Sequence, residues 1–592
     1  MRRFVYPFIY IVLFLLVCTV LPVAGAEEEE FDEELVVTAT KIPQPITEAP
    51  GMIQTIDEET ITEDRNKSVA EVLMEEGFTV STNGGENSQA NIQLGGASAA
   101  QTLVMVDGIP LAGGATGIVD LSAFPLAGVE KIEVVNGPLS ALYGANALGG
   151  VVNIIPNLTG GREERFYLSG GSFGSARGSF QLNRERWGLA VGGATTDGHR
   201  PHSAAERYDL AAQFNLVQQK TEFLKLYGGY RRKKAQIPGD ETSAGYGEQE
   251  DGNLFLNLTG RKEFNDRSLE GKLSYQSLDN HYNTDRHLFT RWASDLTYRY
   301  DYGMHRFLAG LAYNYDTLDS TTSGKHRQDG IGLYLQDLWD LNAALLLHSG
   351  LRWDRVGQNQ ALSPRFGLTW FLTDHFNLGL NYGTAFRVPS MNDLYFSDPW
   401  SQGNPDLTPE KGEKWEITGH WKGAQTSVSA NLFLSHLQDG IFWSSLNGKL
   451  QPQNMEKIKI SGFSLNAAYV WGPLETSFGY AFTDKRGWDS PQNGYSKDLN
   501  HFGQHRFHLK GEADLGKLIC DTGCQVVLGR VDTLSGEKLP DYLLLSAGLR
   551  YQLGTNYTLS LEVENLTDTK YQIQKGYPMP GRSFKLMLSG CY

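Results

Sequence analysis

The feature that most constrains this chain is a repeated segment of about ten residues in which apolar and polar side chains alternate. Residues 428–435 carry Val, Ala, Leu and Leu on one face and Ser, Asn, Phe and Ser on the other. Residues 557–564 separate Tyr, Leu, Leu and Val from Thr, Ser, Glu and Glu in the same way. Because successive side chains of a strand point to opposite faces, each segment has one apolar and one polar face.

The connections between these segments distinguish a membrane barrel from a soluble sandwich, which would show the same alternation. Short connections alternate along the chain with long ones, and this asymmetry between two rims is typical of outer-membrane barrels. The short ones lie at 264–266, 303–304, 342–343, 374–375 and 554–556, and the long ones at 235–251, 389–411 and 487–503. We count about 22 segments, an even number, as a single-chain bacterial barrel requires.

Five tryptophans agree with a membrane wall, since all of them fall near the short connections. They are Trp187, Trp339, Trp370, Trp421 and Trp471. Indole rings favour the boundary between membrane and water, so we expect an aromatic girdle at this rim. Unrelated core tryptophans are the alternative.

The N-terminus predicts export. Arg2 and Arg3 precede an apolar stretch at 4–23, and small residues follow at 24–26. This pattern indicates a signal peptide over residues 1–26, with a retained anchor as the alternative. The formal net charge of −16 argues against nonspecific nucleic-acid binding.

The cysteines leave two interpretations open. Cys520 and Cys524 flank residues 521–523, and an exported protein meets an oxidising compartment. A small hairpin disulfide and two free thiols are both compatible with this spacing. Cys591 lies on the polar, lumen-facing side of the last segment.

Residues 41–157 differ in character from the repeated segments. Ser68 and Glu71 form a capping box before a short apolar helical stripe, and strands are expected at 102–106 and 131–135. A barrel of about 22 strands has a wide lumen that needs filling. We therefore expect an all-β transmembrane barrel of about 22 antiparallel strands at 162–592, with residues 41–157 as an N-terminal mixed α/β plug inside its lumen.

Five further motifs carry a family resemblance. They are TLVMVDGIPL (102–111), VEKIEVVNGPLSALYGANALGGVVNII (129–155), YGTAFRVPSMNDLY (382–395), GNPDLTPEKGEKWEITG (403–419) and VENLTDTKYQ (563–572). With them the chain resembles TonB-dependent outer-membrane receptors, and looks most like the cobalamin (vitamin B12) receptors among them. The resemblance implies energised import of a scarce, bulky nutrient across the outer membrane of a Gram-negative bacterium. It also implies a monomer in contact with lipid and lipopolysaccharide, a small-molecule ligand and no enzymatic activity.

The segment ELVVTAT (34–40) resembles a TonB box. The residues concerned are Leu35, Val36, Val37, Thr38 and Ala39, within a periplasmic extension that we assign to 27–40. They are prone to β structure and follow an acidic run, so we expect an extended strand that is free to pair with TonB. The alternative is an incidental first strand of the plug.

One departure from the family concerns charge. The resemblance implies plug arginines that pair with glutamates of the lumen, but the aligned positions here are Gly95 and Asn136. Glu416, Glu562 and Glu564 are candidates for the lumen-facing glutamates. We therefore expect other hydrogen bonds to hold the plug.

Ligand contacts are expected, from the resemblance, at two plug loops. One comprises Asn83, Glu86, Asn87 and Ser88, and the other Leu111, Ala112, Gly113, Gly114, Ala115 and Thr116. The cobalamin assignment also raises calcium, for which Asp240, Glu241 and Asp251 are weak candidates. No other cofactor is expected.

Other substrates stay open. A ferric siderophore is favoured by the basic run at 231–234, while haem is less favoured because no histidine lies between FRVP (386–389) and NPDL (404–407). A passive porin, an alternative from another class, would share the barrel but need neither plug nor TonB box.

Overall fold

The protein is a closed antiparallel barrel of 22 long strands. The computed structural model describes residues 35–64, 67–85, 88–241, 246–533 and 535–592. The first wall strand, β10 (Glu163–Gly171), pairs with the last, β36 (Ser583–Cys591), with Arg165 opposite Cys591. This closure leaves the wall without an open edge and confirms the expected fold class.

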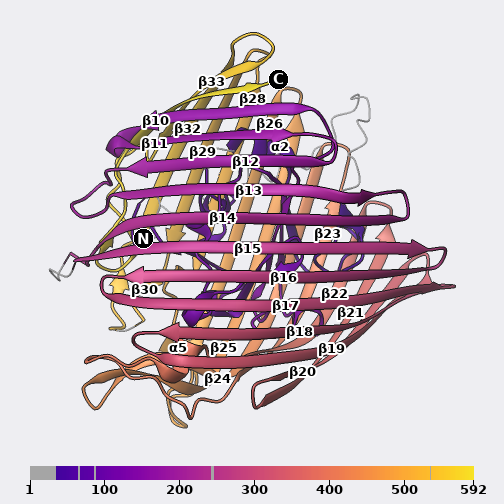
Figure 1. The fold of residues 1–592 in the computed structure, drawn as a ribbon, viewed down its shortest axis with the longest axis vertical. Helices are drawn as coiled ribbons and strands as arrows, with labels where there is room; N and C mark the ends of the chain where they lie inside the picture. The colour runs from indigo at the N-terminus through magenta and orange to yellow at the C-terminus, as the bar shows by residue number, and fades with distance from the viewer. Residues whose placement is uncertain (1–34, 65–66, 86–87, 242–245, 534) are drawn as a thin grey trace.

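The wall strands follow one another around the barrel in chain order (Figure 1). Between β10 and β36 they are β11 (Ala176–Asn183), β12 (Trp187–Thr196), β13 (Ala205–Gln218), β14 (Glu222–Pro238), β15 (Tyr246–Phe264), β16 (Arg267–Tyr282), β17 (Asp285–Tyr302), β18 (His305–Ser320), β19 (Gly324–Asn342), β20 (Leu345–Val356), β21 (Asn359–Thr373), β22 (Phe376–Arg387), β23 (Glu410–Lys422), β24 (Thr426–Leu446), β25 (Lys449–Trp471), β26 (Leu474–Gly487), β28 (His505–Asp514), β29 (Leu518–Leu528), β32 (Tyr542–Gln552) and β33 (Tyr557–Glu564). The connections carry α5 (Met391–Tyr395), η4 (Ser172–Gly174), β27 (Lys497–Asp498), β30 (Arg530–Val531), β31 (Lys538–Leu539), β34 (Gln572–Gln574) and β35 (Tyr577–Pro578).

The alternation in the sequence corresponds to an outward apolar face and an inward polar face. In β24 the side chain of Leu432 is 56% exposed, whereas Asn431 is 3% exposed. In β33 Leu561 faces outward and Ser560 is buried. Phe433 also faces inward although it is apolar, because it packs against Ala97 and Leu148 of the plug.

The two rims differ less in loop length than the sequence predicts. The expected short connections all occur, and we call their side the short-turn rim. On the opposite rim, however, the connections 283–284, 321–323, 357–358 and 447–448 are also only two or three residues long. Strands run on instead, up to 23 residues in β25, while about 10 suffice to cross a membrane. Likewise the expected loop 235–251 is largely taken up by β14 and β15.

The tryptophans expected near the short-turn rim lie there. Trp187, Trp370, Trp421 and Trp471 are between 41% and 62% exposed. Trp339 is half-buried and stacks on His305, with ring centroids 5.0 Å apart. This arrangement matches an aromatic girdle at a membrane boundary.

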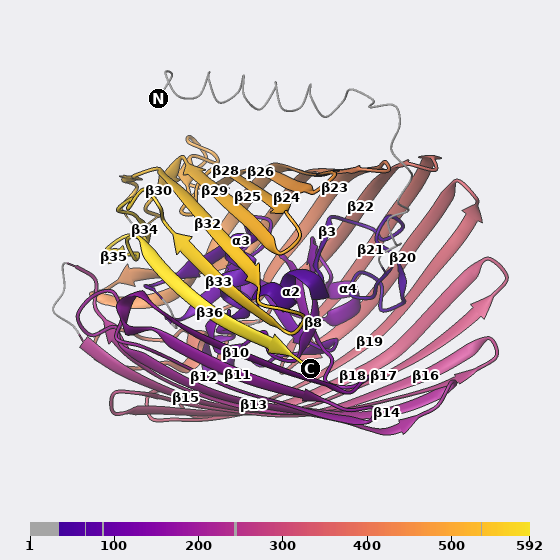
Figure 2. The ribbon, with the colours of Figure 1, turned by 90° about the horizontal axis from the view of Figure 1, so that it is seen from above.

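A mixed α/β domain lies inside the ring of strands (Figure 2). Its five-stranded sheet has the order β3-β8-β9-β6-β7, and β6 and β9 are parallel. Its elements are β1 (Leu35–Val36), β2 (Gln44–Pro45), β3 (Ile53–Ile56), α2 (Glu58–Asp64), α3 (Val69–Glu75), β4 (Thr79–Thr82), β5 (Ala90–Gln93), η1 (Ala99–Gln101), β6 (Thr102–Val106), β7 (Ile109–Pro110), η2 (Gly114–Thr116), η3 (Leu121–Ala123), β8 (Val129–Asn136), α4 (Ser140–Tyr143) and β9 (Gly150–Pro156). The expected capping box before α3 is present, and the expected strands correspond to β6 and β8.

The core of this plug is continuous with the wall on one side. One apolar cluster joins Val106 and Val129 of the plug to Tyr227 and Phe255 of the wall. None of the helices within the described residues is long and apolar enough to cross a membrane.

The hairpin disulfide considered for Cys520 and Cys524 does not form. Both residues lie in the single strand β29 and are free. Four residues of strand span roughly 13 Å, about twice the Cα separation that a disulfide allows. The intervening Asp521-Thr522-Gly523 is therefore mid-strand rather than a turn. Cys591 lies inward as expected, and its thiol donates to Glu163 (3.2 Å).

Candidate functional site

The segment that resembles a TonB box is folded into the plug. Leu35 and Val36 form β1 and pair with β2, and the chain then turns, with the Lys41 amide donating to the Val37 carbonyl (2.8 Å). Val36 and Ala39 are fully buried, in a cluster with plug residues. The expectation of a free extended strand is therefore wrong for this conformation, because burying these apolar side chains stabilises the folded segment.

Glu133 of β8 is the main polar anchor of this segment. Its carboxylate is 0% exposed and accepts hydrogen bonds from the Val37 amide (3.2 Å), the Thr38 amide (2.9 Å) and the Thr38 hydroxyl (2.5 Å). Lys131 Nζ lies 2.9 Å from Glu133 Oε1 and donates to the Leu35 carbonyl (2.6 Å). A buried carboxylate thus pairs with three groups of the segment and one ammonium.

Two further side chains complete the contacts to Thr38. Tyr143 donates to its carbonyl (2.9 Å), and Asn153 Nδ2 donates to its hydroxyl oxygen (3.0 Å). Burial, reinforced by the nearby Glu133 carboxylate, raises the pKa of Tyr143 well above its ordinary value, which keeps the phenol a donor. No local pattern in the sequence pointed to this anchor, since Glu133 and Thr38 are 95 residues apart.

The first predicted ligand loop is the tip of the β4–β5 hairpin, at the rim opposite the short turns. Its Asn83 carbonyl accepts from Arg200 (3.4 Å), and Gly85 lies beside His199 and Pro580 of the barrel connections. Ser88 is half-buried, and its amide donates to Gly85. Glu86 and Asn87 lie outside the described residues. Barrel connections therefore surround this loop.

The second predicted ligand loop is smaller than expected. Leu111 and Ala112 are 8% and 4% exposed, because Leu111 belongs to the plug core and Ala112 packs on the wall. The Ala112 amide also donates to Gln276 of β16 (2.7 Å). These two residues cannot touch a ligand in this conformation. Gly113, Gly114 and Ala115 are half-buried, and Thr116 is exposed.

An aromatic group that the sequence did not single out lies beside this loop. Helix α5 contacts η2, and we call Tyr395, Phe396, Trp400, Trp443 and the stacked His326 the aromatic platform. Tyr395 stacks on His326 at 3.6 Å, and Phe396 meets Trp443 edge to face at 6.3 Å. Trp400 is 77% exposed. The capping box at 390–393 was the readable signal for α5.

The basic run at 231–234 does not form a patch, because alternate residues of β14 face opposite sides. Arg231 is buried against the rings of Phe124 and Phe255. Lys233 is buried and paired with Asp120 of the plug. Arg232 and Lys234 are exposed on the other face.

The calcium candidates lie in separate surroundings. Glu241 accepts from Gln572 (3.0 Å), and a Cβ on Gly576 would lie 2.8 Å from Cβ of Asp240. Asp251 instead accepts hydrogen bonds from Gln249 and Asn280 within the wall. Among the residues that the structure describes, no group of three or more His, Cys, Asp or Glu side chains is arranged to hold a metal ion.

A wall lysine occupies the place of the missing plug arginine. Lys414 Nζ lies 2.6 Å from Glu416 Oε1, and both side chains are at most 5% exposed. A Cβ added to Gly95 would lie 3.5 Å from that Nζ, and one added to Gly137 would lie 2.6 Å from Glu416 Oε2. Glu416 thus faces the plug as expected, but its cation comes from its own strand. The signal was readable, because residues two apart on a strand share a face.

Most other ion pairs across the lumen place the negative charge on the plug. Among the described residues, five carboxylates of the plug meet cations of the wall, in the pairs Glu71–Arg177 (2.6 Å), Asp107–Lys225 (2.6 Å), Glu58–Arg165 (3.8 Å), Asp120–Lys233 and Glu76–Lys510. Barrel cations also hold the plug backbone, as where Arg365 donates to the Ala39 carbonyl (2.6 Å). Hydrogen bonds therefore hold the plug, and so do ion pairs in which the plug supplies the carboxylate and the wall supplies the cation.

Comparison with known proteins identifies the family. Residues 153–566 match the family model "TonB dependent receptor-like, beta-barrel", and residues 45–151 match "TonB-dependent Receptor Plug Domain". The chain belongs to the TonB-dependent receptor family. It is therefore a receptor and transporter of the outer membrane of Gram-negative bacteria that works with TonB on a small-molecule ligand, and it is not an enzyme.

Individual relatives share the full length at modest identity. A curated relative is the vitamin B12 transporter BtuB of Photobacterium profundum, 25% identical, with 94% of this chain and 95% of that protein covered. Similar solved structures include a mutant ferric enterobactin receptor PfeA of Pseudomonas aeruginosa. It has a TM-score of 0.77 and 18% identity, with 92% of this chain and 100% of that chain covered. The copper transporter OprC is also similar, with a TM-score of 0.79 and 17% identity, and 92% of this chain and 98% of that chain are covered. The siderophore receptor PirA of Acinetobacter baumannii has a TM-score of 0.78 and 16% identity, and 91% of this chain and 98% of that chain are covered. At such identities these structures establish the fold.

Proposed function

We propose that this receptor imports a corrinoid, with cobalamin as the leading candidate. The segment Leu35–Ala39 serves as the TonB box, and the plug loops with the aromatic platform form the outer binding surface. The vitamin B12 transporter relative, which matches along nearly the whole chain, supports this choice.

The observation that carries the substrate choice is the pairing of the cations on the outer half of the barrel. A ferric siderophore with several negative charges requires positive charge that its own groups can reach. On the inner face of this half, Arg291 lies against Asp316 (2.7 Å) and Arg387 against Glu410 (2.8 Å), and Arg200 beside the first ligand loop donates to backbone carbonyls. In the outer connections, Lys575 lies against Glu537 (2.7 Å). This arrangement favours a large ligand of low net charge.

The aromatic platform favours the same class of ligand. Exposed rings such as Trp400 provide apolar area with a polar edge, which suits a bulky amphipathic molecule. His326 stacks on Tyr395 and bonds the Ser323 carbonyl (2.6 Å), so one of its ring nitrogens is already engaged. This engagement argues against haem at the platform.

A ferric siderophore is the second candidate, because two of the similar solved structures belong to siderophore receptors. Titration calorimetry of the purified protein with cyanocobalamin, ferric enterobactin and haem separates the candidates. We expect heat of binding with cyanocobalamin alone. Binding of ferric enterobactin or haem without cyanocobalamin would overturn the corrinoid assignment.

The role of the TonB box needs a separate test in cells. Deleting residues 35–39 should leave cyanocobalamin binding to whole cells unchanged and abolish its energised uptake. Uptake that survives this deletion would indicate passive passage, as in a porin.

A further inference from the structure

The outward face of strands β23 to β26 carries a group of basic side chains that we call the basic cluster. Its members are Lys411 of β23, His436 of β24, Lys457 and Lys459 of β25 and Arg486 of β26. Alternation places the cluster on the outside of the barrel. Ile458 and Ile460, on either side of Lys459, are 1% exposed and face inward, whereas Lys459 is exposed.

Strand pairing brings the cluster together from segments that are far apart in the chain. Lys459 lies directly opposite His436 on one neighbouring strand and Arg486 on the other. Lys411 and Lys457 flank one residue of β24 in the next row toward the outer rim. Residues directly opposite each other share a face, and their Cα atoms are about 5 Å apart. The five side chains therefore form one continuous surface.

The cluster lies at the level where the membrane ends on the outer side. Lys411 is ten residues from Trp421 of the aromatic girdle, and Lys459 is twelve residues from Trp471. A tilted strand crosses the apolar layer of a membrane in about 9–11 residues. The two ammonium groups are therefore at the height of the lipid headgroups of the outer leaflet.

Apolar side chains continue directly below the cluster, toward the middle of the membrane. Trp415, Ile417 and Leu432 face outward and are between 48% and 56% exposed. Tyr382 packs against Trp415, with ring centroids 4.4 Å apart. Aromatic rings of this kind are typical of the boundary of the apolar layer. Positive charge thus stands immediately above a surface that contacts acyl chains.

Part of the positive charge of the cluster is not neutralised by the protein. Among the residues that the structure describes, neither Lys411 nor Lys459 has an ion-pair partner. Two carboxylates of the same face, Glu413 and Asp484, lie instead against the other members His436 (3.5 Å) and Arg486 (2.8 Å). The two lysines are therefore available to an anion from outside the chain.

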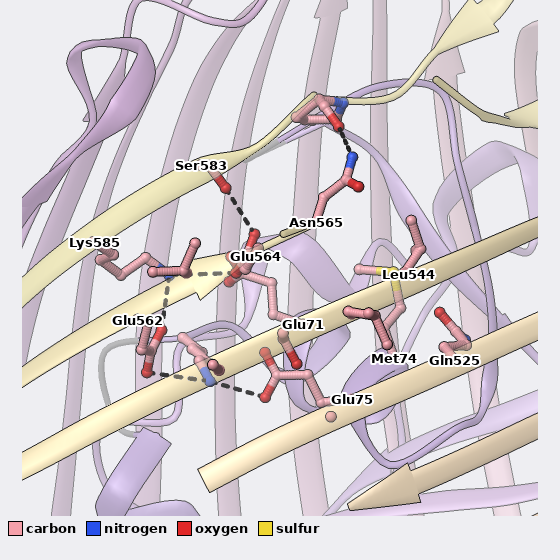
Figure 3. A pocket seen from close by; sticks show the side chains of 18 of the residues that line it. Glu71, Met74, Glu75, Gln525, Leu544, Glu562, Glu564, Asn565, Ser583 and Lys585 are labelled. Carbon is pink, nitrogen blue, oxygen red and sulfur yellow. Dashed lines mark hydrogen bonds and ion pairs between the residues drawn. The ribbon is translucent and has the colours of Figure 1, made fainter. Parts of the chain in front are cut away.

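Charged groups at other places in the barrel show the contrast. Arg232 faces outward ten residues from the start of β14, and it lies 2.7 Å from Glu250 of the next strand. Inside the barrel, a cavity of about 580 Å³ between plug and wall is also bordered by paired charges, such as Lys585 with Glu562 at 3.8 Å (Figure 3). Pairing of this kind is what Lys411 and Lys459 lack.

We propose that the basic cluster binds lipopolysaccharide of the outer leaflet. Lys411 and Lys459 hold a phosphate group of its lipid A, because an ammonium group binds phosphate as a compact charge with three donors. The apolar side chains below the cluster contact its acyl chains. The cluster faces the membrane boundary and not the lumen, so the inference does not depend on which nutrient the receptor imports.

The test measures the binding of bisphosphorylated lipid A to the whole receptor, purified in a non-ionic detergent and freed of lipopolysaccharide, by native mass spectrometry. The double variant Lys411→Gln and Lys459→Gln removes two charges and keeps both side chains polar. Its matched control, Lys234→Gln and Lys325→Gln, removes two exposed lysines from the outward faces of β14 and β19.

A basic residue close to an anionic lipid surface contributes about 1 kcal/mol. The double variant should therefore bind lipid A about 30-fold more weakly than wild type, which corresponds to about 2 kcal/mol. The control should stay near the wild-type affinity, and Lys411→Arg with Lys459→Arg, which keeps both charges, should do the same. Equal weakening in the cluster variant and the control would indicate unspecific attraction and overturn the proposal.

Two further probes separate lipopolysaccharide from other lipids. Lipid A without its phosphates should bind weakly, and equally to wild type and to the double variant. Phosphatidylglycerol should also bind weakly and should not respond to the substitutions. If phosphatidylglycerol binds wild type as tightly as lipid A and loses the same affinity in the double variant, the cluster accepts any anionic lipid and the proposal is wrong.

Folding of each variant is checked by the heat-dependent gel migration of the barrel. If the double variant does not fold, the single variant Lys459→Gln takes its place and should bind lipid A about fivefold more weakly than wild type. Unchanged affinity in that folded variant would also overturn the proposal.

Discussion

Replacing Glu133 by glutamine tests whether one buried carboxylate holds the TonB box in the plug. The amide has nearly the same size and keeps one acceptor oxygen, but it lacks the charge. Its NH₂ group would face the amides of Val37 and Thr38, which are donors themselves. The substitution therefore removes hydrogen bonds without opening a cavity.

The expected magnitude follows from the contacts. The carboxylate accepts from three donors of the segment and pairs with Lys131 at 2.9 Å. Hydrogen bonds to charged groups contribute about 1.5–3 kcal/mol each, and we expect between one and two of them to be lost. A loss of about 2–4 kcal/mol raises the population of the released segment by roughly 30- to 700-fold.

Hydrogen exchange of the protein in lipid nanodiscs, without TonB, measures this population. The amides of Val37 and Thr38 should exchange faster in Glu133→Gln by that factor. Glu130→Gln, on the same strand, is the matched control and should exchange like the wild type.

Two outcomes would refute the reasoning. Unchanged exchange at residues 37–38 would mean that apolar burial of Val36 and Ala39 alone holds the segment. A similar acceleration throughout β6 and β9 would mean that Glu133 stabilises the whole plug rather than the box.

Three further predictions follow from other charged or reactive groups. Lys414→Met leaves Glu416 buried without its cation, so thermal unfolding should reveal a loss of about 3–5 kcal/mol, which the double variant with Glu416→Gln should largely restore. Burial would raise the pKa of Glu71, but Arg177 outweighs burial and holds that pKa below the ordinary range. Its stabilisation is therefore fully present above a pH of about 4.3 and declines on further acidification, so the thermal unfolding temperature should fall from about pH 5 to about pH 3 by more in wild type than in Glu71→Gln. Finally, the two cysteines of β29 are free, so reduction should leave gel mobility unchanged, and a mass shift of 2 Da on reduction would contradict this.

The wall could be predicted from the sequence because its signal is local. Whether Leu432 faces lipid and Asn431 faces the lumen depends only on the alternation along one strand. The short connections and the nearby tryptophans are local as well. The capping box of α3 belongs to the same class, since Ser68 and Glu71 are three residues apart.

The same local rule explains two differences between sequence and structure. Residues 231–234 are one basic run in the sequence, but strand alternation divides them between two faces of β14. Cys520 and Cys524 have the spacing of a small hairpin, but strand β29 continues through the residues between them.

The anchor of the TonB box was beyond prediction for a different reason. Glu133 meets Thr38 because β8 is an inner strand of the plug sheet, between β3 and β9. Such a contact depends on the tertiary arrangement of segments 95 residues apart. The burial of Leu111 and Ala112 likewise depends on their meeting with the wall.

The relocation of the cation from plug to wall has a mechanical consequence. With an arginine on the plug, movement of the plug would leave a wall carboxylate buried without a partner, which is costly. Here Lys414 and Glu416 both belong to β23 and stay together when the plug moves. Glu76 and Lys510 do separate when the plug moves, but their side chains are 25% and 33% exposed, so water can solvate both charges. Keeping the buried Lys414–Glu416 pair within the wall therefore lowers the electrostatic cost of moving the plug.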